Sequence, residues 1–147
     1  DEKAEVLSTL GDSPAAYRYE NAHGQRFIVY CFDFTTPYPE NALVRSYCRQ
    51  RQLIDGLEWA GRRKLPAVCP GQPDLYMTCK RTGDGLAVGL WNLSVDVISD
   101  ARIRLDGAYT ALEAFNAAGA IEGDGVLLSS DIMHFSFVGV TVRNTKN

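Results

Sequence analysis

Motifs that carry catalysis or bind nucleotides are absent from this sequence. It contains no Gly-x-Ser-x-Gly elbow, no Gly-x-Gly-x-x-Gly loop and no Walker loop, so it gives no sign of the nucleophilic or phosphate-binding chemistry of those motifs. Its two histidines, His23 and His134, fall in an expected turn and an expected strand. A solvent-facing or hydrogen-bonded side chain explains each of them better than a general base does. We therefore predict no catalytic residue and no cofactor in this chain.

Cysteines are few, and their spacing does not suit a metal site. Cys31, Cys48, Cys69 and Cys79 are 17, 21 and 10 residues apart, and no Cys-x-x-Cys pair occurs, which excludes a zinc ribbon or finger. Two of them interrupt the apolar runs FIVYCFDF and LYMTC, where a small apolar side chain packs well. The sequence predicts buried, reduced thiols and no metal site. One disulfide, using Cys69, remains the alternative if the protein is extracellular.

Long apolar runs and a strong charge imbalance are also missing. No run approaches the roughly 20 residues that span a bilayer, and the N-terminus is too acidic and polar for a signal peptide. The net charge is −3, from 15 basic and 18 acidic residues, so we predict neither a membrane nor a nucleic-acid partner. Because the chain starts without Met, we expect a piece of a longer protein. Its compartment stays open.

The first half of the chain predicts a hairpin followed by a helix. Residues 16–34 form two strand-like runs around His23-Gly24, and the second run is apolar on both faces, as in a central strand. The prolines of 35–41 end it, and Asn41 is an expected N-cap for a helix over 42–61. The expected buried stripe of that helix is Leu43, Tyr47, Ile54 and Leu57.

The second half predicts short strands joined by tight turns. The expected strands are 75–80, 86–92, 101–105, 108–115 and 132–142. In the last one the apolar positions change phase near Gly139, which predicts a β-bulge, and we expect Leu90 and Phe135 in the interior. The predicted fold is mainly β with one long helix: a hairpin and surface helix over 1–66, then an antiparallel β-sandwich over 67–147.

Aromatic side chains are the main candidates for ligand binding, because exposed rings hold sugars by stacking. The candidates are Trp91, Tyr76, Trp59 and Tyr38. The strand that carries Trp91 is apolar, so a core position suits this residue better than a binding position. The following Asn92-Leu93-Ser94 matches an N-glycosylation acceptor, although Asn is also a common strand terminator.

The run LAVGLWNL, a polar break and ARIRL resemble the C-terminal β-sandwich that follows the catalytic barrel in many glycoside hydrolases, among them the α-galactosidase and α-amylase relatives. The resemblance spans about residues 74–142. The earlier segment RQRQLIDGLEW is similar to the closing elements of the glutamine-amidotransferase-like α/β domain of some β-galactosidases, so residues 1–66 would be a remnant of such a domain. In those families the catalytic acids lie in the barrel, so none carries over here.

This resemblance implies a non-catalytic accessory or structural domain of a carbohydrate-active enzyme. Its partners would be upstream domains of a larger protein or a neighbouring subunit, with carbohydrate as a candidate ligand. Two alternatives stay open: an independent carbohydrate-binding module, and a domain whose site is completed by a partner chain. An exposed apolar patch would favour docking, a groove lined by coplanar rings would favour sugar binding, and a deep pocket with convergent titratable groups would favour an enzyme.

Overall fold

The computed structural model describes residues 4–31 and 46–144. The chain divides into two compact units, Asp1–Arg63 and Lys64–Asn147, called unit 1 and unit 2 below. The proline-rich segment 35–41, with Tyr38 and the expected helix cap Asn41, lies outside the described residues.

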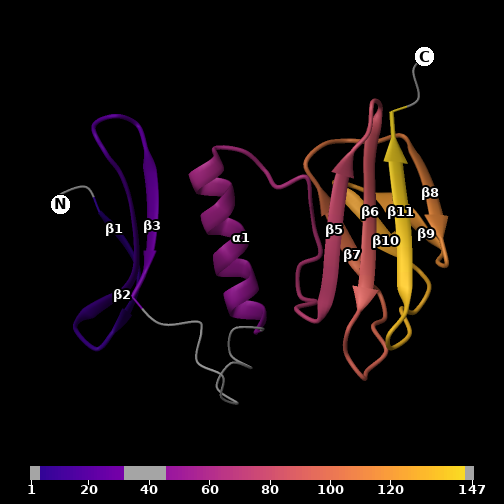
Figure 1. Ribbon diagram of the computed structural model, residues 1–147, viewed down its shortest axis with the longest axis horizontal. Helices are drawn as coiled ribbons and strands as arrows, with labels where there is room; N and C mark the ends of the chain where they lie inside the picture. The colour runs from indigo at the N-terminus through magenta and orange to yellow at the C-terminus, as the bar shows by residue number, and fades with distance from the viewer. Residues whose placement is uncertain (1–3, 32–45, 145–147) are drawn as a thin grey trace. The chain divides into compact units, whose positions relative to one another are not determined.

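Unit 1 contains a three-stranded antiparallel sheet, which includes the predicted hairpin (Figure 1). Its strands are β1 (Glu5–Leu10), β2 (Ser13–Glu20) and β3 (Arg26–Tyr30). The Asn21 side chain stabilises the hairpin turn, where its Oδ1 accepts the backbone N–H groups of His23 and Gln25 at 2.9 and 3.0 Å. The predicted central position of the second strand is wrong, because β2 lies in the middle of the described sheet and β3 at its edge.

The helix of unit 1, α1 (Tyr47–Gly61), starts later than predicted. Its N-cap is Ser46, whose side chain accepts the backbone N–H of Arg49. Of the predicted apolar stripe, Leu43 lies outside the described residues and Ile54 is half-buried. Tyr47 and Leu57 are both more than half exposed, so their expected burial is wrong. The helix instead buries Gly56, where an added Cβ would lie 2.9 Å from Ile28 Cδ1 of β3. The missing side chain allows close helix–strand packing, which a search for large apolar residues overlooks.

Unit 2 is an antiparallel β-sandwich of two four-stranded sheets, as the sequence predicts (Figure 1). One sheet has the order β4-β7-β10-β9, and the other has the order β5-β6-β11-β8. The strands are β4 (Ala67–Val68), β5 (Leu75–Arg81), β6 (Gly85–Asn92), β7 (Arg102–Leu105), β8 (Ala111–Phe115), β9 (Gly119–Glu122), β10 (Gly125–Leu128) and β11 (Phe137–Arg143).

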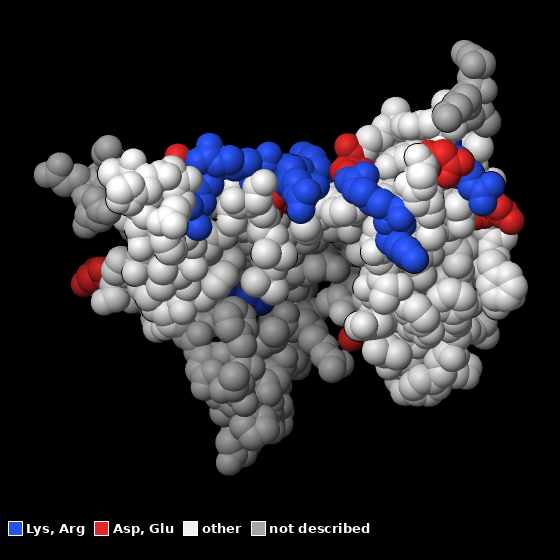
Figure 2. All heavy atoms as spheres, turned by 45° about the horizontal axis from the view of Figure 1, so that its top comes forward, with Lys and Arg blue, Asp and Glu red and all other residues white. Residues whose placement is uncertain are grey.

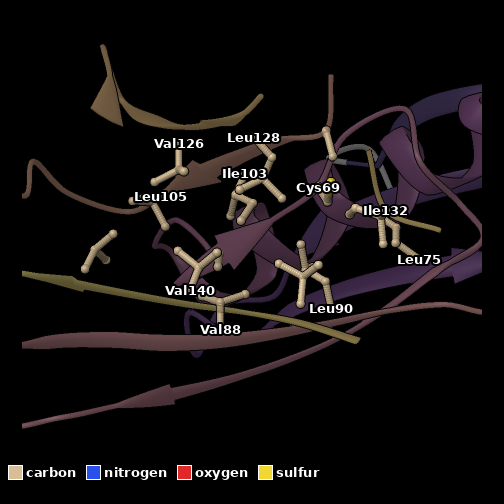
Figure 3. Close-up of a cluster of buried hydrophobic side chains, with 14 of the residues drawn as sticks. Cys69, Leu75, Val88, Leu90, Ile103, Leu105, Val126, Leu128, Ile132 and Val140 are labelled. Atoms are coloured by element: carbon tan, nitrogen blue, oxygen red, sulfur yellow. The ribbon is translucent and has the colours of Figure 1, made fainter. Parts of the chain in front are cut away.

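The core of unit 2 fills the space between these two sheets (Figure 3). Alternate residues of β6 point inward, so that Leu86, Val88 and Leu90 are buried, and Ile103 and Leu105 of β7 face them as predicted. Burying each such side chain contributes roughly 1.5–3 kcal/mol. The inward-facing side chains of these strands therefore form the core, and the outward-facing side chains are available for other roles.

The end of the chain departs from the prediction of one long bulged strand. β11 pairs with β6 without a register shift at Gly139, and the phase change arises earlier, in a turn where the Ser136 N–H donates to Met133 O. Phe135 lies in that turn with φ 53° and is 71% exposed, so its expected interior position is wrong. A turn reverses the facing of side chains as a bulge does, and sequence alone does not distinguish them.

Candidate functional site: the aromatic face

The outer face of the sheet β5-β6-β11-β8 brings together two of the four predicted binding residues. Tyr76 of β5 pairs with Trp91 of β6, and their ring centroids lie 5.7 Å apart. Trp91 points away from the core and is half-buried, so the core position that the apolar strand favoured is wrong. The signal was present in the sequence: Leu86, Val88 and Leu90 alternate inward, which places Trp91 outward.

Two phenylalanines that sequence reasoning did not select complete this surface. Phe137 of β11 pairs with Trp91, and the two ring centroids are 4.5 Å apart. Phe115 of β8 lies diagonally beyond it, with its centroid 6.2 Å from that of Phe137. One row of rings thus crosses the four neighbouring strands. We call this outward surface, with the polar residues next to the rings, the aromatic face.

Two glycines form the floor beside the rings. Gly89 and Gly139 pair with each other in adjacent strands and have no side chains to fill the surface. The Trp91 and Phe137 rings lean over Gly89, where an added Cβ would meet both rings at 3.0 Å. A shallow open groove of about 550 Å³ runs along this floor. The missing side chain at Gly89 therefore lets the two rings pack down against the sheet beside the groove.

Polar side chains line the groove next to the rings and beyond them. Their backbones follow the same ladder: Thr78 pairs with Gly89, and Lys80 with Ala87. On the other side Thr141 pairs with Glu113, and Arg143 Nη2 lies 3.5 Å from Glu113 Oε2. Two hydroxyls, an ammonium and an exposed ion pair thus offer donors and acceptors within reach of a molecule lying on the rings.

Trp59, the third predicted residue, belongs to unit 1 and has a structural environment. Its ring lies between two guanidinium groups, with Arg18 Cζ 5.0 Å and Arg26 Cζ 4.8 Å from the ring centroid. Arg26 Nη1 also donates to the Trp59 backbone oxygen at 2.6 Å, and Arg26 Nε donates to Glu20 at 2.8 Å. These contacts connect α1 to the sheet and occupy the ring with cation–π interactions. Trp59 therefore belongs to unit 1, whereas Tyr76 and Trp91 belong to unit 2.

A second group of rings, on the sheet of unit 1, has ring planes that are closer to parallel. The Tyr19 and Phe27 centroids are 5.0 Å apart with an interplanar angle of 15°, and Tyr17 stacks on Tyr19 at 22°. On the aromatic face the angles are larger, 56° for Tyr76–Trp91 and 40° for Trp91–Phe137, so the coplanar rings expected of a sugar-binding groove are not found there. The unit 1 rings stack on one another, however, which uses their flat faces. The aromatic face combines rings, groove and polar groups in one place.

Asn92, which ends β6, has a structural role. Its side chain is fully buried and uses all of its hydrogen-bonding capacity. Nδ2 donates to the backbone oxygens of Asp96 and Ile132 at 2.7 and 2.9 Å, and Oδ1 accepts the N–H and O–H of Ser94 at 2.9 and 2.8 Å. The acceptor tripeptide therefore marks a buried amide that organises two loops, and glycan attachment to Nδ2 would require this fold to open.

The cysteines are all free thiols, but only one is buried. Cys69 lies in the core, where burial raises its pKa to about 12, so it stays protonated and unreactive. Cys31, Cys48 and Cys79 are exposed, which corrects the prediction that apolar neighbours imply burial. Within residues 4–31 and 46–144, no group of three His, Cys, Asp or Glu side chains has the arrangement of a metal site.

Neither a membrane-spanning helix nor a relationship to known proteins indicates a function. In the part of the chain described, no helix has the length and apolarity needed to cross a bilayer. Comparison of the sequence and structure with known protein families, curated proteins and solved structures found no match. The chemistry of the aromatic face is therefore the basis on which a function is assigned.

Proposed function

We propose that unit 2 is a carbohydrate-binding module whose ligand lies on the aromatic face. The observation that carries the proposal is the row Tyr76–Trp91–Phe137, aligned in register across three neighbouring strands. Aromatic rings present a broad apolar surface to the C–H groups of a pyranose, and polar side chains at the edge bind its hydroxyls. Both kinds of group are adjacent here.

The exposure of this face supports a binding role over a core role. Tyr76 and Phe115 are 57% and 61% exposed, although burial of large rings is strongly favourable. Since the opposite side of the same strands already supplies the core, folding of unit 2 does not need these rings. A contiguous exposed aromatic surface beside polar groups is typical of a binding site.

The geometry indicates the kind of glycan. Because successive rings are tilted by 56° and 40°, they form a twisted platform and not a plane. A single soluble glycan chain, whose consecutive sugars rotate relative to each other, fits such a platform better than a flat crystalline surface does. The groove is open and shallow, so the expected affinity is weak, with a Kd between about 1 μM and 1 mM.

This role is compatible with an accessory domain of a carbohydrate-active protein, which the resemblance at residues 74–142 implies. In such a protein, binding of the glycan would raise its concentration near a catalytic domain. The chemistry would take place in that domain, and this chain would contribute binding alone.

Affinity electrophoresis of the full chain in gels that contain soluble polysaccharides tests the proposal. The probes are a neutral β-glucan, a mannan, a galactan and an acidic uronan. We expect retardation by at least one of them and a loss of about fivefold or more in apparent affinity for Tyr76→Ala. Tyr47→Ala is the matched control, because Tyr47 is similarly exposed, at 51%, on α1 of unit 1.

Two outcomes would overturn the proposal. One is that the unaltered chain migrates alike in all four gels and in a blank gel. The other is that Tyr76→Ala binds as well as Tyr47→Ala. Trp91→Ala removes more ring area but also uncovers Gly89. A loss of polysaccharide binding by this variant therefore counts only if its urea midpoint is unchanged.

A further inference from the structure

A second exposed surface lies at one end of the sandwich, where β6 continues to β7 and β10 continues to β11 (Figure 1). We call it the loop end and define it by residues 93–100 and 129–136. Its two loops carry five large, exposed apolar side chains. These are Leu93 at 59%, Val95 at 78%, Val97 at 44%, Met133 at 50% and Phe135 at 71% exposed.

The loop end is held in place and is not a frayed connection. The backbones of Ile98 and Ile132 exchange two hydrogen bonds of 3.1 and 2.8 Å, and both side chains are buried. The Asn92 amide joins the same two loops through Asp96 O and Ile132 O. The exposed residues therefore project from a preorganised scaffold, which lowers the entropic cost of binding a partner.

The backbone conformation and exposure of Phe135 indicate that the exposed side chains contact another molecule. Phe135 adopts φ 53°, in the left-handed region that favours glycine and asparagine and that costs conformational free energy for a bulky side chain. Its ring gains little burial in return. A large aromatic residue placed at a position suited to glycine, and left exposed, is explained if its ring is buried against another molecule.

The charge around the loop end narrows the choice of partner. The two segments that define the loop end, residues 93–100 and 129–136, contain no lysine or arginine. They contain three exposed aspartates, which are Asp96, Asp100 and Asp131. In Figure 2 the blue lysines and arginines of unit 2 lie above its lower part, which is largely white. An anionic lipid surface would be repelled by this acidic rim.

We propose that the loop end docks a protein partner that has an apolar cleft bordered by lysine or arginine. The five apolar side chains would fill the cleft, and the aspartates would face the basic border and set the orientation. Phe135 and Val95, the two most exposed of the five, would be the central anchors. The loop end adjoins the aromatic face, since Leu93 and Phe135 are two residues from Trp91 and Phe137, respectively, but the proposal does not rest on sugar binding.

Peptide binding to the full chain tests the proposal. The probes are two arrays of short peptides that share their Leu, Phe and Trp positions but carry Lys and Arg in one array and Asp and Glu in the other. We expect binding to members of the basic array only, weakening as salt rises, with a loss of about tenfold or more for Phe135→Gly. Tyr76→Ala, which would impair sugar binding, should leave peptide binding unchanged.

The Phe135→Gly variant separates binding from folding. Glycine suits φ 53°, so this variant should be at least as resistant to urea as the unaltered chain while it loses the peptide. Leu10→Ser is the matched control, because Leu10 is 81% exposed in unit 1 and should have no effect on peptide binding.

Four results would overturn the proposal. The first two are equal binding to both arrays and no binding to either. The third is binding to phosphatidylcholine vesicles, with or without phosphatidylserine, that Phe135→Gly abolishes, and the fourth is concentration-dependent self-association that the same variant abolishes. The third would assign the loop end to a lipid surface, and the fourth would assign it to a second copy of the chain. A failure of the polysaccharide experiment with success here would remove the sugar proposal alone.

Discussion

Replacing Asn92 with alanine should destabilise unit 2 more than any single loss at its surface. The substitution removes four hydrogen bonds of 2.7 to 2.9 Å from a fully buried side chain. At about 1 kcal/mol net for each bond, the expected loss is about 3–4 kcal/mol, because the Ser94 hydroxyl, which donates to Asn92 Oδ1 in the unaltered chain, can then donate to Asp96 O, and Ile132 O keeps the N–H of Ile98. This loss is a large part of the roughly 5–15 kcal/mol that stabilises a typical domain.

The assay is a urea titration of the full chain in which labelling of the buried Cys69 thiol reports unfolding of unit 2. With a urea dependence of about 2 kcal/mol per M, the midpoint should fall by roughly 1.5–2 M. Asn116→Gly is the control, because Asn116 is exposed with φ 56° and its side chain donates a hydrogen bond of 3.4 Å to Phe137 O.

The control should change the free energy of unfolding by no more than about 0.5 kcal/mol. If Asn92→Ala shifted the midpoint as little as Asn116→Gly does, the amide would not be the element that organises the two loops. The preorganisation argued for the loop end would then lose its main support.

Two further predictions concern titratable groups. In the native chain at mildly alkaline pH, a thiol reagent should modify three cysteines and spare Cys69, because burial raises the pKa of Cys69 to about 12. Mass spectrometry that counts the labelled sites checks this prediction. Fast modification of Cys69 would contradict its position in the buried core. The three exposed thiols are Cys31, Cys48 and Cys79. The hydrogen bonds from Arg26 and Arg62 lower the pKa of Glu20 below 4.5, so its stabilising effect is present above that pH and is lost as the pH falls through the folded value. Thermal unfolding should show that Glu20→Gln lowers the Tm of unit 1 at neutral pH but not in acid, and a Tm difference that is constant with pH would refute the assignment.

Local patterns predicted the parts of the fold that depend on neighbours in sequence. The alternation in β7 indicates that Ile103 and Leu105 face the core and Arg102 does not, since a half-buried strand repeats every two residues. In β6 the same alternation was overlooked, and Trp91 was expected in the core. The hairpin turn around His23-Gly24 was predicted from its polar residues and glycine. The short strands β9 and β10 were not predicted, because each is only four residues long and sequence does not show that they pair with each other.

The candidate sites depended on pairings between distant residues. Phe137 lies far from Tyr76 and Trp91 in sequence, and only the pairing of β11 with β6 places it beside them. The loop end likewise joins residues 93–100 to 129–136 through Ile98 and Ile132. No local propensity predicts such partners, because long-range strand order is set by the packing of the whole core.

By itself the sequence determined that this protein is rich in antiparallel strands with one helix, and that it lacks the common catalytic motifs. Composition and local periodicity are enough for these conclusions because they act over a few residues. The tertiary structure alone decided that Phe137 lies beside Trp91 and Tyr76, that Asn92 is buried, and that Phe135 is exposed. Each of these depends on which distant strands share a hydrogen-bonded ladder and which side of that ladder the core occupies.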